Sequence, residues 1–282
     1  MIANRRVLWC VLILVLLGSV SLAGCAGTPQ IEKPQFTWRH YTYSVLLVPE
    51  MLGKSPRLEL AFSLLRMEYP ETHAQALHDI LYGQPSLDEY RDSVINEQRK
   101  NYRSRAGDFP PADGGGTASY NWRYVERFSV KQTFERGIVI ERDLETYSGG
   151  AHFGRTTRYY NIEVNADEFD PHKFRLLTLD DLFANYQEDQ KLRDIIYKEL
   201  RDYSNLGTAQ PLSQGIYFTN EPELSFNFFI SENGLGLRWD PAQIAPHAQG
   251  SIQIILPWHI ISPLMLYSGI EALANYDIHL LL

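Results

Sequence analysis

Residues 120–134 read YNWRYVERFSVKQTF and give the clearest strand signal in the chain. Large apolar side chains recur at even positions with polar ones between them, the period of two that a strand with one buried face requires. We expect one continuous face made of Tyr120, Trp122, Tyr124, Phe128, Val130 and Phe134. The stretch therefore predicts a long, half-buried strand.

The same kind of pattern extends outward on both sides of this stretch. A turn at Arg136 and Gly137 leads into a second apolar run, and after Gly149 and Gly150 a third follows, so we expect a three-stranded meander. Ser86 and Glu89 form a capping box at the start of a helix. The expected strands are 36–50, 57–69, 138–144 and 156–164, and the expected helices are 71–82 and 86–105.

The second part of the chain also mixes helices and strands. Thr178 begins a short helix whose first turn contains Asp180 and Asp181, so we interpret this acidic pair as a helix cap rather than as catalytic. Further helices are expected at 190–203 and 258–276, the second starting at either Trp258 or Pro263. Further strands are expected at 224–230, 235–239 and 251–257. The fold class is α+β, with antiparallel sheets, helices packed on one side, and two closely joined halves at 36–165 and 166–282.

The N-terminus has the features of a lipoprotein signal. Arg5 and Arg6 precede an apolar run from 7 to 17, and Leu-Ala-Gly-Cys ends at Cys25. This ending resembles the lipobox of bacterial lipoproteins, in which the chain is cut before a lipidated cysteine. We predict a signal peptide at 1–24 and a lipidated tether at 25–35. The alternative is an ordinary signal peptide with a chance cysteine at its end.

The cysteine count supports lipidation. The chain has two cysteines, Cys10 and Cys25, and Cys10 would leave with the signal. The mature protein would keep one cysteine at its first position, so an internal disulfide, a multi-cysteine zinc site and a cysteine nucleophile in the fold are excluded. We expect anchoring to the outer side of a bacterial membrane. Ala26 favours the outer membrane where one exists.

Charge and motifs restrict the function further. Removing residues 1–24, which carry two arginines and no acidic residue, lowers the net charge from −8 to −10. This balance does not suit nucleic-acid binding and favours cationic partners. His73 and His78 are five residues apart, a spacing that does not place them on one helical face. We expect no metal, no cofactor and no coherent catalytic set.

One segment has unusual local chemistry, the run YSGGAHFG at 147–154. Gly149 and Gly150 allow a backbone path closed to other residues and bring main-chain N–H groups into the open. Tyr147, His152 and Phe153 flank them. We interpret the segment as a candidate binding loop. A base or ligand role for His152 and a tight inter-strand turn remain open.

Three motifs carry a family resemblance. They are the YSGGAH run, Tyr160 with Asn161, and LTLDDLF at 177–183. The run WDPAQIAPHAQG at 239–250 is also similar to the usual ending of this family. The chain resembles a family of extracytoplasmic domains of unknown function. These domains form the external part of RsiV-type anti-sigma factors that bind lysozyme, accompany PdaC-type polysaccharide deacetylases, and occur alone in envelope lipoproteins.

The resemblance implies an α+β fold and no catalytic residues. Ala242 and His247 stand where the family usually has tyrosines, so lysozyme binding is not carried over by the resemblance alone. The anti-sigma and deacetylase roles require segments that we do not find here.

The leading hypothesis is a lipid-anchored, non-enzymatic envelope module that binds or senses a protein, possibly lysozyme, or a cell-wall polymer. Two alternatives stay open. One is a peptidoglycan-modifying hydrolase using His152 with Asp143, Glu145 or Glu163. The other is a purely structural lipoprotein.

Overall fold

The computed structural model describes residues 35–47, 56–69, 71–105, 121–134, 136–148, 153–164, 174–278 and 280. These residues belong to one compact unit, Pro34–Leu282. The predicted signal peptide, Cys25 and the tether up to residue 34 lie outside the described residues. Gly149, Gly150 and His152 lie outside them too.

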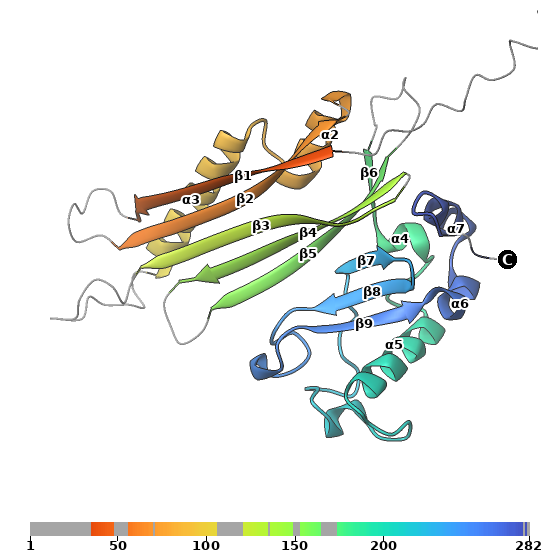
Figure 1. The fold of residues 1–282 in the computed structure, drawn as a ribbon. Coiled ribbons are helices and arrows are strands. Elements are labelled where there is room, and N and C mark those ends of the chain that lie inside the picture. Colours follow the sequence, from red (N-terminus) through yellow and green to blue (C-terminus); the bar gives the residue numbers. More distant parts are fainter. Residues whose placement is uncertain are drawn as a thin grey trace, which may run out of the picture. The chain divides into compact units, whose positions relative to one another are not determined.

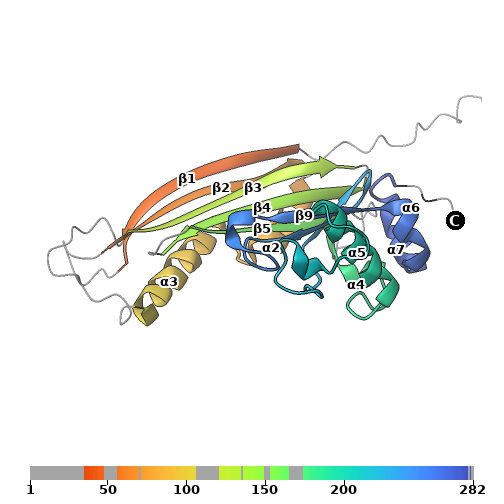
Figure 2. The ribbon, with the colours of Figure 1, turned by 90° about the horizontal axis from the view of Figure 1, so that it is seen from below.

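The first half of the unit is built on a six-stranded sheet (Figure 1). Its strands, in spatial as well as chain order, are β1 Gln35–Leu46, β2 Arg57–Tyr69, β3 Trp122–Thr133, β4 Gly137–Tyr147, β5 Gly154–Val164 and β6 Phe174–Leu177. All neighbours are antiparallel except β2 and β3. A parallel pair needs a crossover connection, and the helices α2 Glu71–Tyr82 and α3 Leu87–Arg105 lie in that connection. Figure 2 shows both helices on one face of this sheet.

The second half holds a three-stranded antiparallel sheet. Its strands are β7 Phe228–Ser231, β8 Gly234–Trp239 and β9 Ile252–Pro257, and its helices are α4 Leu179–Leu182, α5 Gln190–Tyr203, α6 Trp258–Ile261 and α7 Tyr267–Ala274. Short 3₁₀ turns are η2 Leu212–Gln214, η3 His247–Gln249 and η4 Ser262–Leu264. The expected α+β class with antiparallel-rich sheets is confirmed. The predicted boundary at 165 falls in 165–173, outside the described residues, and stays a prediction.

Three sequence-based expectations are wrong in detail. The strand expected at 224–230 spans only Phe228–Ser231. The expected helix 258–276 is interrupted, because Met265 is extended and the Leu266 N–H donates to the Leu182 carbonyl at 2.8 Å. Phe134 was expected on the same face of the strand as Phe128, but it lies on the opposite face. A bulge between Val130 and Gln132 shifts the pairing with β4. One extra residue reverses the alternation of all that follow it. Phe134 accordingly packs in the second core, against Tyr276.

Two hydrophobic cores meet at β4. Ile140 belongs to the core beneath α2 and α3, whereas its neighbour Val139 belongs to the core of the second half. Successive strand residues point to opposite faces, so β4 separates the two cores.

Side chains rather than strand ladders join β5 to the second sheet. The buried Asn161 amide donates to the Phe228 carbonyl at 2.8 Å and accepts from the Ile230 N–H at 2.8 Å. Asn227 accepts from the Tyr159 N–H, and Asp240 accepts from the Thr157 N–H, both at 3.0 Å. Asn227 and Asp240 thus satisfy N–H groups on the free edge of β5, and Asn161 satisfies backbone groups of β7. Together these side chains tie the two sheets together.

Candidate functional site

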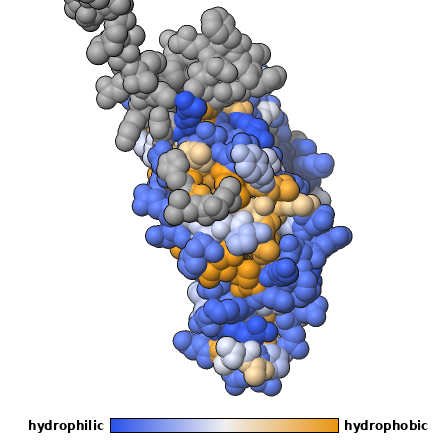
Figure 3. Space-filling model, turned by 90° about the vertical axis from the view of Figure 1, so that its right-hand side faces the viewer, coloured by the Kyte–Doolittle hydropathy of each residue, from blue (hydrophilic) through white to orange (hydrophobic). Residues whose placement is uncertain are grey.

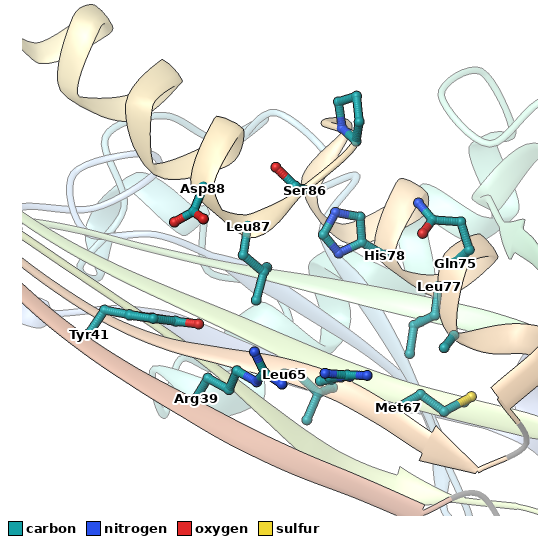
Figure 4. Close-up of a pocket in the computed structure, with 13 residues that line it drawn as sticks. Arg39, Tyr41, Leu65, Met67, Gln75, Leu77, His78, Ser86, Leu87 and Asp88 are labelled. Atoms are coloured by element: carbon teal, nitrogen blue, oxygen red, sulfur yellow. The ribbon is translucent and has the colours of Figure 1, made fainter.

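A pocket of about 350 Å³ lies between the β1–β2 pair and the two helices above it (Figure 4). We call it the helix–sheet pocket. Its lining residues are Arg39, Tyr41, Leu65, Arg66, Met67, Ala74, Gln75, Leu77, His78, Pro85, Ser86, Leu87 and Asp88. Its volume is at the small end for ligand pockets, so it suits a fragment such as a sugar or the end of a peptide.

The pocket exists because β2 is longer than its pairing with β3. The β2–β3 ladder covers residues 58–63 of β2, and residues 64–69 continue with only β1 alongside. Beyond the ladder, the Tyr82 hydroxyl accepts from the Leu65 N–H and donates to the Leu65 carbonyl, both at 2.8 Å. On β3, the Phe128 carbonyl accepts from the Trp38 indole at 2.9 Å. Side chains thus replace the missing ladder where the strands separate.

The floor of the pocket is apolar and buried. Leu65, Met67 and Leu77 are each no more than 2% exposed. Beside them Tyr82 packs its ring edge-on against Phe128, with centroids 5.1 Å apart. Burial raises the pKa of Tyr82 well above its usual value, so its hydroxyl stays protonated and available as a donor.

The turn between α2 and α3 closes the pocket at one end. Gly83 has a φ of 62° and its N–H bonds to the Asp79 carbonyl, a glycine-ended helix that lets the chain reverse. His78 Nε2 bonds to the Gln84 carbonyl oxygen at 2.8 Å. Ser86 then caps α3 by accepting from the Glu89 N–H at 3.2 Å, as the capping box predicts.

The acceptor groups around the pocket are largely engaged by the protein itself. Asp88 is held by Arg91 at 2.8 Å. Gln75 donates to Asp79 at 2.7 Å, and the Gln84 carbonyl is taken by His78. A ligand rich in hydrogen-bond donors would therefore meet acceptors that already have a protein partner.

Donor groups are less committed. Within the described residues, the Arg39 side chain makes no hydrogen bond or ion pair, and the Tyr41 hydroxyl makes no hydrogen bond. Arg66 has a loose contact with Glu68 at 3.6 Å, and both side chains are nearly half exposed. Figure 4 shows Arg39 and Tyr41 on the strand side, with His78, Ser86 and Leu87 facing them from the helices. The pocket thus offers donors above an apolar floor.

A second polar cluster lies deeper, under α3. Glu126 is fully buried and is paired with Arg142, while the Tyr90 hydroxyl lies 2.8 and 2.7 Å from its two carboxylate oxygens. Burial and the adjacent Glu126 carboxylate raise the pKa of Tyr90, which keeps its hydroxyl a donor. This cluster is a satisfied buried ion pair within the core.

The two described members of the predicted binding loop, Tyr147 and Phe153, lie elsewhere. Tyr147 ends β4 and Phe153 precedes β5, and their rings pack at a tilt of 38° with centroids 4.9 Å apart. Through the strand register, Tyr147 is aligned with Arg123 of β3 and Glu59 of β2. From Glu59 to Met67 is eight residues along β2, roughly 26 Å. The structure brings Tyr147 and Phe153 together but places them far from the helix–sheet pocket.

Each of the carboxylates proposed to act with His152 is engaged by an arginine. Asp143 is paired with Arg155 at 3.0 Å, and Glu145 with Arg123 at 3.6 Å. Thr157 of β5 is aligned with Asp143 in the strand pairing, and Glu163 lies six residues further along β5. Glu163 binds Arg175 at 2.6 Å. Asp181 accepts from Thr178 as a helix cap, as predicted.

Sequence reasoning missed the helix–sheet pocket, although a signal was present. Arg39 occupies the same strand phase as Tyr41, Tyr43 and Val45, which all contact the core. Glu126 likewise interrupts the apolar phase of β3. A charged residue in an inward phase marks either a buried pair, as at Glu126, or a pocket, as at Arg39.

Comparisons with known proteins find one matching family and structures with a similar fold. Residues 180–259 match a protein family described as "Protein of unknown function (DUF3298)". A crystal structure of a DUF3298 family member from Bacteroides fragilis NCTC 9343 is 18% identical, with a TM-score of 0.65 over 86% of this chain and 97% of that one. A DUF3298 family protein from Pseudomonas aeruginosa PAO1 is 14% identical, with a TM-score of 0.51 over 85% of this chain and 98% of that one. No curated protein matches the chain.

The structural likeness thus extends over both halves, whereas the sequence match covers 180–259 only. The match at 180–259 and the two similar structures support the expected resemblance to a domain family of unknown function. In the described part of the chain, no helix has the length and hydropathy to cross a membrane. No group of three or more histidine, cysteine, aspartate or glutamate side chains is placed to hold a metal ion in those same residues.

Proposed function

We propose that this protein is a lipid-anchored, non-enzymatic binding module of the bacterial cell envelope, and that its ligand is a cell-wall polymer. The helix–sheet pocket is the observation that carries the proposal. It combines buried apolar side chains, Leu65 and Met67, with the uncommitted donors Arg39 and Tyr41. Concave sites with an apolar lining and a few convergent polar groups are typical of ligand binding.

A wall polymer fits this lining because its peptides and sugars carry carboxylates and hydroxyls that accept hydrogen bonds. The anchor at Cys25 would hold the pocket within reach of such a polymer. In a chain of net charge −8, an arginine without an acidic partner is unusual. Asp88, the acidic residue that lines the pocket, is paired with Arg91 instead.

Co-sedimentation with purified peptidoglycan sacculi tests the proposal. Full-length protein purified in detergent should pellet with sacculi, and the double variant Arg39→Gln/Arg66→Gln should pellet much less. The matched control is Arg123→Gln/Arg127→Gln. It removes the same charge from exposed β3 positions whose strand phase is opposite to that of the core residues Tyr124 and Phe128, on the face of the sheet away from α2 and α3. Equal pelleting of both variants would reject the helix–sheet pocket as the binding site, and no pelleting of the wild type would reject the polymer as ligand.

Lysozyme is a second candidate ligand, and the acidic net charge favours it. Opposite charges speed the encounter of two proteins, and lysozyme is cationic. Calorimetric titration with lysozyme tests this directly. No heat at about tens of micromolar would leave only binding too weak to matter.

A structural role through protein contacts is favoured by exposed apolar side chains. Figure 3 shows hydrophobic residues gathered on the side of the molecule where α6 and α7 lie in Figure 1. Exposed large side chains on the elements of this side are Leu176, Ile260 and Tyr267. Concentration-dependent self-association in sedimentation, abolished by Ile260→Ser, would support this role.

The hydrolase alternative depends on His152, which lies outside the described residues. The separate arginine pairing of Asp143, Glu145 and Glu163 favours the binding module over it. Release of soluble products from sacculi, lost in His152→Ala, would support the hydrolase instead.

A further inference from the structure

We infer that the helix–sheet pocket recognises a peptide carboxylate, with Arg39 as its main ligand-binding residue. The inference rests on the proposed function for the location of the site and adds the chemical class of the group bound. It follows from which groups around the pocket are free and which are occupied.

The first step is the balance of donors and acceptors. Asp88 is bound by Arg91, Asp79 by Gln75, and the Gln84 carbonyl by His78, at distances of 2.7 to 2.8 Å. The guanidinium of Arg39 and the hydroxyl of Tyr41 have no such partner among the described residues. A ligand group that only accepts hydrogen bonds is therefore the best match.

The second step concerns charge. Arg39 carries a permanent positive charge, and a guanidinium pairs most strongly with a planar anion through two parallel hydrogen bonds. Arg66 adds a second positive charge in the lining, held only loosely by Glu68 at 3.6 Å. The ligand group is therefore anionic.

The third step distinguishes a carboxylate from a phosphate. Asp88 lines the pocket, and Glu68 lies beside Arg66. These carboxylates repel a doubly charged phosphate more than a singly charged carboxylate. A single negative charge therefore fits better.

The fourth step is size and the apolar floor. Leu65, Met67 and Leu77 are buried, and Leu87 points toward them from α3 (Figure 4). This floor can contact small apolar side chains next to the carboxylate. With a volume of about 350 Å³, the pocket accommodates the last residues of a peptide.

Titration by NMR with four small probes tests the inference on full-length protein in detergent. The probes are N-acetyl-alanyl-alanine with a free carboxylate, its C-terminal amide, sn-glycerol 3-phosphate and acetate. We expect the peptide acid to bind best and its amide to bind at least about tenfold more weakly, because the charge-assisted bonds are lost.

Variants then assign the binding to Arg39. Arg39→Gln should weaken binding of the peptide acid about 10- to 100-fold, whereas Arg123→Gln should leave it unchanged. Because Arg39 is exposed and makes no internal pair in the described region, the variant should unfold at the same temperature as the wild type. Arg39→Lys, which keeps the charge but loses the planar fork, should recover only part of the affinity.

Four outcomes would overturn the inference. They are equal affinity for acid and amide, unchanged affinity in Arg39→Gln, tighter binding of glycerol phosphate than of the peptide acid, and no binding of the peptide acid at about 10 mM. Sacculus binding that is retained alongside any of these would leave the proposed function standing. Peptide-acid binding without sacculus binding would reject the polymer and keep the carboxylate site.

Discussion

The hydroxyl of Tyr82 lies 2.8 Å from both the backbone nitrogen and the carbonyl oxygen of Leu65, seventeen residues earlier in the chain. One side chain of α2 thus satisfies both main-chain groups of a β2 residue that no longer has β3 beside it. This contact holds α2 over the end of β2. It therefore fixes the width of the helix–sheet pocket, which Leu65 and Leu77 line from the two elements.

Tyr82→Phe tests the contact. Removing the hydroxyl leaves two buried backbone groups without this partner, so we expect a loss of about 1–3 kcal/mol in the free energy of unfolding. Urea denaturation measures it. Tyr203→Phe is the control, because Tyr203 is 46% exposed. Equal stability of Tyr82→Phe and wild type would show that the Leu65 contact is dispensable.

Asn161→Ala should weaken the junction between the two sheets. The amide is buried and serves both the Phe228 carbonyl and the Ile230 N–H, so its loss should cost about 1–3 kcal/mol or more. Asn96→Ala, at an exposed position on α3, should change stability by only a few tenths of a kcal/mol. Denaturation of the two variants side by side decides the matter, and similar midpoints would argue against a role of Asn161 at the junction.

The free energy of unfolding should fall at alkaline pH, because a buried tyrosine ionises more readily in the unfolded chain than in the folded protein. Burial, followed by the nearby Glu141 carboxylate, raises the pKa of Tyr159 from 10.0 to about 12. Below pH 10 this tyrosine is protonated in the folded and the unfolded protein, so its contribution to the stability of the folded protein is fully present. As pH rises from 10 to about 12 only the unfolded chain ionises, so the stabilisation is lost through that window.

Tyr159→Phe should therefore flatten the decline in stability between pH 10 and about 12. Urea denaturation at several pH values measures the slope, with Tyr267→Phe, at a 67% exposed position, as the control. The same slope in wild type and Tyr159→Phe would contradict the assignment.

Cys25→Ser tests the anchor. Without the thiol no lipid can be attached, and the protein should move from the detergent phase to the aqueous phase in a detergent partition of cell extracts. Radiolabelled palmitate should be incorporated into the wild type only. Continued membrane association of the variant without label would show that another segment holds the chain.

The sequence predicts the elements well because their signals are local. The strand at 57–69 and the helices at 71–82 and 190–203 have the predicted bounds, since alternation, helical spacing and caps are written in neighbouring residues. The bulge after Val130 could not be predicted, because it depends on pairing with β4. Its consequence, the move of Phe134 to the other core, follows from that pairing alone.

The site was harder to predict than the fold. Arg39 and His78 are 39 residues apart and meet only because α2 folds back over β1 and β2. The family motifs point elsewhere for a physical reason. Asn161 and Asp240 both stand within them. Asn161 bonds from β5 to backbone groups of β7, Asp240 accepts from the Thr157 N–H of β5, and these bonds hold the two sheets together. Those motif residues have structural contacts, and the pocket lies in a part of the chain where the resemblance is diffuse.

The crystal structure of the protein with a saturating peptidoglycan fragment tests the central claim most directly. The account predicts the fragment in the helix–sheet pocket, with a carboxylate within hydrogen-bonding distance of the Arg39 guanidinium and an apolar side chain against Leu65 and Met67. A fragment bound at the Tyr147–Phe153 end of the sheet, with the pocket empty, would contradict it.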